Sequence, residues 1–219
     1  FESAEPNALL PLIGLQEFQA VRELSETQVQ PKVSLNWKPT DHVSLFAHWT
    51  RGFKGGGFNA FAYREDDEEL EFKSETTSEL GFDLKASFFG GTLRPNISLY
   101  RMDARDFQVL GRQKPPVVAG TGTVPPVCVP GTACIPPQVL GLGTTRVFNA
   151  PKAYAQGVEA DLTWLAFDGF SLMATMGYND TKFVDFPQNE CPASNPETYC
   201  DATGRPFPFA PRWDATLTP

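Results

Sequence analysis

The chain has 219 residues, 18 Lys and Arg against 26 Asp and Glu, and a formal net charge of −8. This acidic balance disfavours nucleic acid as a partner, because binding a phosphate backbone requires a basic surface. The sequence has no run of about 18 apolar residues, which argues against a transmembrane helix.

Alternating apolar and polar residues predict β-strands along much of the chain. In the clearest segment, 78–88, the even positions from Leu80 to Phe88 are apolar and the odd positions from Glu79 to Ser87 are polar or small. A period of two over about ten residues is a strand with one apolar face, whereas a helix would scatter these charges. The pattern predicts about seven strands, near 33–38, 43–50, 78–88, 93–99, 158–164, 170–178 and 213–218.

The connections between these strands alternate between short and long. Tight turns are predicted at 38–42, 90–91 and 167–169, and long polar or Pro/Gly-rich loops near 52–75, 112–146 and 187–208. An antiparallel sheet with one short-turned and one long-looped rim is typical of outer-membrane barrels, whose short turns face the periplasm.

Aromatic residues favour the same interpretation. They lie beside the predicted short turns, as amphipathic rings do at a membrane interface: Trp37, Phe88, Phe89, Trp164 and Phe167. We therefore predict an all-β fold, part of a transmembrane antiparallel up-and-down barrel. A soluble β-sandwich stays open as an alternative, because its strands also have one apolar face each.

The ends of the chain suggest part of a longer protein. The sequence does not begin with Met, shows no signal peptide and stops just after a strand begins. An odd, partial set of strands leaves unpaired edges and cannot close. We expect residues 1–219 to be a partial barrel, in which 1–30 is an extracellular loop and 31–219 holds the strands.

The four cysteines form two local pairs, Cys128 with Cys134 and Cys191 with Cys200, each inside one predicted loop. Three connectivities are formally open, and pairing within a loop is the simplest. Disulfides would imply an oxidising compartment. A zinc site would need clustered ligands, so no metal site is predicted.

A glycine-rich segment, RGFKGGGFN at 51–59, carries the candidate ligand-binding residues. Arg51, Lys54 and Asn59 could project toward an anionic ligand near a pore mouth, while the glycines alone could serve a sharp turn. The segment is not a phosphate loop, because it lacks the Gly-Lys-Ser/Thr ending and no helical pattern follows.

Charged residues on the polar faces of the strands are expected to face a lumen and to pair across the sheet. They are Glu79, Asp83, Lys85, Arg94, Glu159 and Asp161. A structural role is favoured over ligand contact for these six. Neither histidine, His42 or His48, is placed beside a nucleophile, so neither catalysis nor a cofactor is predicted.

Several segments resemble the β-barrel of TonB-dependent outer-membrane receptors. They follow that family's order: 31–35 leading to 51–59, 72–75 to 79–81, 100–103 to 106–109, 149–150 to 157–161, and then 210–213. The family's N-terminal plug and its TonB-contacting segment have no counterpart in the sequence.

The resemblance implies a receptor of the Gram-negative outer membrane. Its ligand would be a ferric siderophore or another scarce nutrient, and uptake would be energised through TonB. The expected partners are outer-membrane lipid, this ligand, and TonB through the N-terminal region outside the chain. The alternatives are a passive porin-like channel and a soluble β-sandwich binding module.

Overall fold

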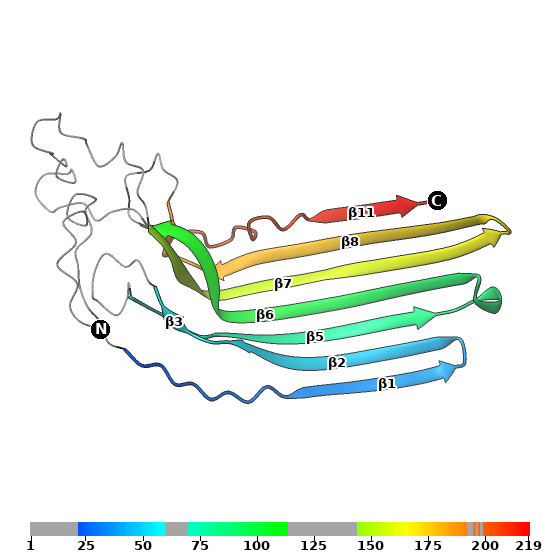
Figure 1. Cartoon of the computed structure of the whole chain (residues 1–219), viewed down its shortest axis with the longest axis horizontal. Coiled ribbons are helices and arrows are strands. Elements are labelled where there is room, and N and C mark those ends of the chain that lie inside the picture. Colours follow the sequence, from blue (N-terminus) through cyan, green and yellow to red (C-terminus); the bar gives the residue numbers. More distant parts are fainter. Residues whose placement is uncertain (1–21, 60–69, 114–143, 192–194, 196, 198) are drawn as a thin grey trace, which may run out of the picture.

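The computed structural model describes residues 22–59, 70–113, 144–191, 195, 197 and 199–219. They contain one antiparallel sheet of seven strands, in the order β1-β2-β5-β6-β7-β8-β11 (Figure 1). Each long strand pairs with the next one in the sequence, which confirms the predicted up-and-down order. The strands are β1 (Lys32–Thr40), β2 (Val43–Lys54), β5 (Glu75–Ala86), β6 (Leu93–Gln113), β7 (Thr144–Phe167), β8 (Phe170–Asp185) and β11 (Trp213–Thr218).

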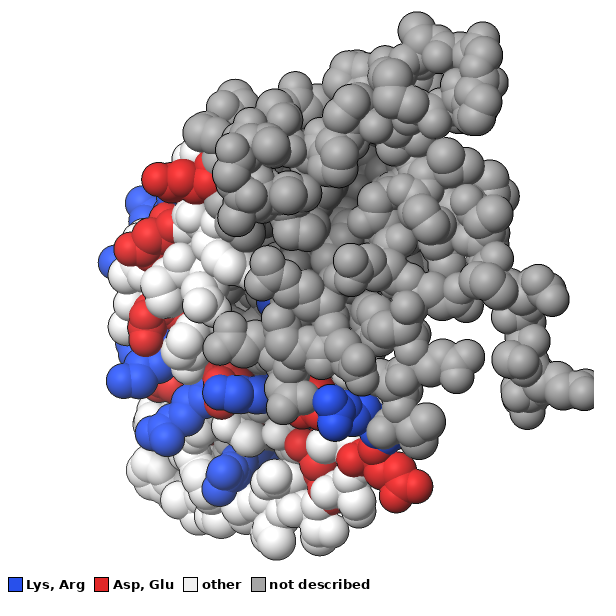
Figure 2. Space-filling view, turned by 90° about the vertical axis from the view of Figure 1, so that its left-hand side faces the viewer, with Lys and Arg blue, Asp and Glu red and all other residues white. Residues whose placement is uncertain are grey.

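The short connections share one end of the sheet and the long ones share the other (Figure 1). The turn between β5 and β6 contains the 3-10 turn η2 (Phe89–Gly91), where Gly90 and Gly91 have φ of 66° and 93°. Glycine adopts these left-handed angles without a steric penalty. Figure 2 looks onto the long-loop rim, where Lys and Arg are interspersed with Asp and Glu over the described surface.

The strands differ in extent from the sequence prediction. β2 continues to Lys54 and β5 begins at Glu75, so the loop predicted at 52–75 is shorter, and it contains the paired β3 (Gly57–Phe58) and β4 (Glu71–Phe72). β9 (Asn189–Glu190) and β10 (Tyr199–Cys200) pair within the loop predicted at 187–208. β5 stops at Ala86, and Phe88 forms an isolated bridge with Leu93.

The register gives the sheet one apolar face. One row crosses all seven strands: Leu35, Ala47, Phe82, Leu99, Val158, Tyr178 and Trp213. Leu35 is 68% exposed and Phe82 is 50% exposed. Soluble monomers rarely expose such a contiguous apolar surface. Within the described residues, no second sheet layer covers this face, as a β-sandwich would require.

The described residues contain no helix that is long and apolar enough to cross a membrane.

Buried residues gather at the long-loop rim. The cluster comprises Ala104, Phe148, Ala150, Ala153, Phe183, Phe186 and Ala202, with Phe107, Val109, Tyr199 and Phe207 packed against it. The rings of Phe107 and Phe207 stack with centroids 4.9 Å apart. This contact packs the connection between β8 and β11 against the long-loop end of β6.

Candidate functional site

The polar face of the sheet carries a histidine between two carboxylates. Cross-strand pairing sets His48 of β2 opposite Gly81 of β5. Glu79 and Asp83 lie two positions to either side of Gly81, within diagonal reach of the ring. His48 Nε2 lies 3.1 Å from Glu79 Oε1, and His48 Nδ1 lies 3.6 Å from Asp83 Oδ2.

The imidazole lies over a glycine, and the next pair of strands repeats this arrangement. A Cβ at position 81 would collide with the ring of His48. Similarly, the ring of Tyr100 lies over Gly157, and its Oη donates a hydrogen bond to Asn179 Oδ1 at 3.1 Å. Aromatic rings and glycines thus alternate along one cross-strand row, and each ring lies against the surface of the sheet.

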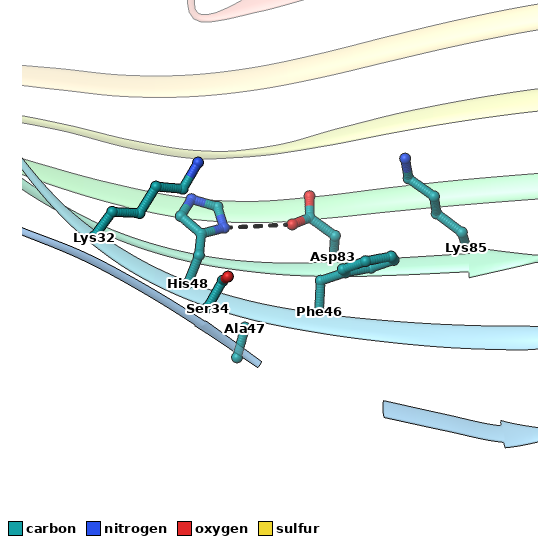
Figure 3. Close-up of a pocket in the computed structure, with 7 residues that line it drawn as sticks. All are labelled: Lys32, Ser34, Phe46, Ala47, His48, Asp83 and Lys85. Atoms are coloured by element: carbon teal, nitrogen blue, oxygen red, sulfur yellow. Dashed lines mark ion pairs between the residues drawn. The ribbon is translucent and has the colours of Figure 1, made fainter. Parts of the chain in front are cut away.

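A cavity of about 350 Å³ opens on the polar face beside His48 (Figure 3). It is lined by Lys32, Ser34, Phe46, Ala47, His48, Asp83 and Lys85. The ammonium group of Lys85 lies 5.7 Å from the centroid of the Phe46 ring. In Figure 3 two lysines flank the pair formed by His48 and Asp83. This arrangement can bind an anionic or mixed-charge group by ion pairing and hydrogen bonding.

The six charged residues predicted to face a lumen all lie on this polar face. On its own strand, each of them alternates with residues of the apolar face. Asp83, Ser98 and Glu159 are direct cross-strand neighbours. Their contacts differ from simple charge pairing: Ser98 Oγ donates to Asp83 Oδ1 at 2.7 Å, and Arg94 Nε donates to the Gly91 carbonyl at 2.9 Å. Among the described residues, both ion pairs on this face involve His48.

The structure separates the three candidate ligand-binding residues. Arg51 pairs with Ser78, and its side chain lies on the apolar-face side of β2. Lys54 is three positions further along the strand and faces the opposite side. Asn59 is 5% exposed, accepts a hydrogen bond from the Val147 amide at 2.8 Å and donates one to the Val147 carbonyl at 3.4 Å.

Comparison with known proteins identifies the family. The sequence model described as "TonB dependent receptor-like, beta-barrel" matches residues 14–218. The chain belongs to the TonB-dependent receptors, as part of their β-barrel. This family comprises outer-membrane transport receptors, not enzymes. The family predicted from the ordered motifs is therefore confirmed, as is the barrel fold.

Solved structures share the fold of this receptor barrel. The ferric yersiniabactin uptake receptor FyuA from Yersinia pestis has a TM-score of 0.54 and 16% identity, covering 87% of this chain and 22% of its own. The siderophore receptor PiuA from Acinetobacter baumannii has a TM-score of 0.54 and 15% identity, covering 85% and 22%. The copper transporter OprC has a TM-score of 0.51 and 16% identity, covering 70% and 20%. The chain thus spans about a fifth of the length of these proteins.

Side-chain amides at the long-loop rim of the receptor barrel anchor the connection between β2 and β5. Asn149 Nδ2 donates to the carbonyls of Lys73 at 3.0 Å and Asp106 at 2.7 Å, while its Oδ1 accepts from the Lys73 amide at 2.8 Å. Gln108 Nε2 donates to the Gly55 carbonyl at 2.8 Å. Sequence reasoning missed these anchors, since they join residues more than 40 positions apart with no periodic signal.

A disulfide joins Cys191 and Cys200, with Cα atoms 4.9 Å apart. Glu197 lies near both sulfur atoms, but a disulfide leaves no thiolate to bind a metal ion. Cys128 and Cys134 lie outside the described residues. Next to the bridge, hydrogen bonds from the hydroxyl and backbone amide of Thr203 lower the pKa of Asp201.

Proposed function

We propose that this chain forms part of the wall of an outer-membrane receptor that imports a ferric siderophore, or a similar scarce nutrient, with energy from TonB. The observation that carries the proposal is the family match over residues 14–218. The names of FyuA and PiuA, a ferric yersiniabactin uptake receptor and a siderophore receptor, support this cargo. OprC, named as a copper transporter, makes a metal ion the second candidate cargo.

The geometry gives each surface of the sheet a role in this proposal. The apolar row from Leu35 to Trp213 meets lipid, because its exposed side chains have no partner layer in the described residues. The polar face with the His48 cavity lines the lumen. The short turns face the periplasm and the long loops face outward, where Lys54 would meet the incoming ligand.

Uptake of ⁵⁵Fe-siderophore by cells that express the complete receptor tests the proposal. We expect the protein in the outer-membrane fraction, and saturable uptake that stops when TonB is deleted or the proton gradient is collapsed. Uptake that persists without TonB would indicate a passive porin-like channel. The same assay with Cu²⁺ distinguishes the second cargo. If the expressed protein stayed soluble without detergent, this result would contradict its proposed place in the outer membrane.

A further inference from the structure

Three lysines of the polar face follow one line along the neighbouring strands β1, β2 and β5. Lys32 of β1 is opposite Thr50 of β2, and Lys85 of β5 is opposite Ser44 of β2. Lys54 lies on the same face at the long-loop end of β2. All three lysines are exposed, and we call them the lysine ladder.

The lysine ladder runs along the strands from the long-loop rim toward the short turns. Lys54 is four positions from the level of Lys32, about 13 Å, and Lys85 is six positions beyond that level, about 20 Å. The cavity beside His48 fills the longer interval. In Figure 3 the side chains of Lys32, His48 and Lys85 rise from the same side of the sheet.

The two carboxylates beside the cavity are turned toward other groups. The ring of His48 lies 3.1 Å from Glu79 and 3.6 Å from Asp83. Ser98 donates a further hydrogen bond to Asp83, of 2.7 Å. The lysines at the two ends of the cavity are therefore its positively charged donors.

The lysines themselves have no carboxylate partner in the part of the chain that the structure describes. Glu75 is opposite Lys54, but its Oε2 accepts a hydrogen bond from the Gln108 amide at 2.8 Å. The ammonium group of Lys85 lies 5.7 Å from the centroid of the Phe46 ring. Among the described residues, no ion pair includes a lysine of the ladder. Their ammonium groups are thus available to an anion.

The strands on the other side of the sheet carry the opposite charge. From Gly157 to Thr163 on β7, and over the residues paired with them on β8 and β11, the described polar face has no Lys or Arg. It has three carboxylates there: Glu159, Asp161 and Asp214. Charges of one sign along a narrow passage steer a charged solute. An anion in the lumen is repelled by β7 and β11 and attracted to the lysine ladder.

We propose that the lysine ladder guides an anionic iron chelate along the lumen wall, and that the cavity beside His48 is an intermediate binding site for its carboxylate groups. The inference rests on the proposed function, in which the polar face lines the lumen. Lys32 and Lys85 pair with the carboxylates, and the hydroxyl of Ser34 adds a hydrogen bond. A volume of about 350 Å³ is small for a ligand pocket, so it fits one arm of a chelate.

The weakness of each contact suits passage rather than storage. An exposed lysine binds a carboxylate weakly, because water competes for both groups. Transport requires that a solute leave each site as readily as it enters, and several weak sites in a row meet this requirement. The cargo can therefore move from Lys54 to Lys32 and on to Lys85.

The first test measures the charge selectivity of the cavity in the complete receptor, purified in detergent. Ser34→Cys introduces a thiol there, which is treated with an anionic sulfonate or a cationic trimethylammonium methanethiosulfonate reagent. The receptor without the introduced thiol gives the background. We expect the anionic reagent to react at least about tenfold faster than the cationic one, relative to their rates with a free thiol.

Two double variants locate the source of this selectivity. Lys32→Gln/Lys85→Gln should abolish the preference for the anionic reagent. The matched control Lys152→Gln/Lys182→Gln removes the same charge from the opposite face of the sheet and should keep the preference.

The second test separates passage from capture at the loops. In cells without TonB, Lys32→Gln/Lys85→Gln should bind ⁵⁵Fe-siderophore with the affinity of the wild type, which also shows that the variant is folded. In cells with TonB, its uptake rate per receptor should fall about fivefold, the loss of two weak charge contacts. Lys32→Arg/Lys85→Arg keeps both charges and should import at the rate of the wild type.

Three results would overturn the lysine ladder: equal reaction of the introduced thiol with both reagents, no reaction with either, or unchanged uptake by Lys32→Gln/Lys85→Gln. Absence of TonB-dependent uptake in the wild type would instead refute the proposed function. The thiol test does not depend on uptake, so the two failures are distinguishable.

Discussion

The imidazole of His48 lies over the backbone of Gly81 on the neighbouring strand, in space that a Cβ would occupy. This contact keeps the imidazole ring close to the backbone of β5. The two ring nitrogens then point along β5, toward Glu79 on one side and Asp83 on the other. A residue without a side chain therefore organises the charge pattern beside the cavity on the polar face.

We expect Gly81→Ala to displace His48 and to destabilise the receptor by about 1–3 kcal/mol, because the added methyl group overpacks a filled position. A urea titration of the receptor in detergent gives the free energy of unfolding and so measures the loss. Gly55→Ala is the matched control, since a Cβ there would meet its nearest neighbour at an ordinary 3.7 Å. In a His48→Ala background the cost of Gly81→Ala should largely vanish. An equal cost in both backgrounds would contradict the proposed packing.

The alternation of residues was enough to predict the sheet but not its contacts. The alternation from Leu80 to Ala86 revealed both faces of β5, because all side chains on one face meet the same kind of environment. The central feature of the polar face, His48 between two carboxylates, depends on the register between β2 and β5. A pattern read along one strand contains no information on register, although it did place His48 and Glu79 on polar faces.

The long-loop ends of β6 and β7 lack the alternation that identified the other strands. Asp106 has a φ of 51°, which interrupts the regular alternation of side chains, and Phe107 packs into the aromatic cluster. Asn59 was predicted as a ligand contact from its glycine-rich surroundings. Its amide bonds the backbone of Val147, which lies 88 positions away. Such long-range contacts leave no trace in local sequence.

The opposite orientations of Arg51 and Lys54 lead to different effects on uptake. If the polar face lines the lumen, Lys54→Ala should weaken the binding of an anionic ferric siderophore by about two- to fivefold, the loss of one surface charge contact. Arg51→Ala should leave binding unchanged. Fluorescence quenching of the complete receptor by the ferric siderophore measures both constants. A larger effect at Arg51 would show that the ligand approaches over the other face.

Removing the Asn149 side chain should loosen the connection between β2 and β5. Asn149→Ala deletes three hydrogen bonds to the backbone of Lys73 and Asp106, with an expected cost of about 1–3 kcal/mol. Hydrogen exchange at the Lys73 amide should accelerate about tenfold or more. Asn36→Ala on β1 is the control and should leave that amide protected. Unchanged protection in Asn149→Ala would show that Gln108 alone holds the segment.

The disulfide between Cys191 and Cys200 should stabilise the aromatic cluster at the long-loop rim. The bridge closes a loop with a sequence separation of 9, for which the chain-entropy model gives about 2–3 kcal/mol. We expect Cys191→Ser/Cys200→Ser to release the segment around Phe186 and Phe207 from its packing, while the seven-stranded sheet stays folded because its backbone pairing is independent of the bridge.

Limited proteolysis with chymotrypsin measures that release. Cleavage near Phe207 should appear in the double variant and be absent in the wild type, whereas cleavage within β6 to β8 should stay absent in both. The control is Cys128→Ser/Cys134→Ser, which alters the other cysteine pair and should leave Phe207 protected. Protection of Phe207 in both variants would show that stacking on Phe107, 4.9 Å between centroids, holds the connection without covalent help.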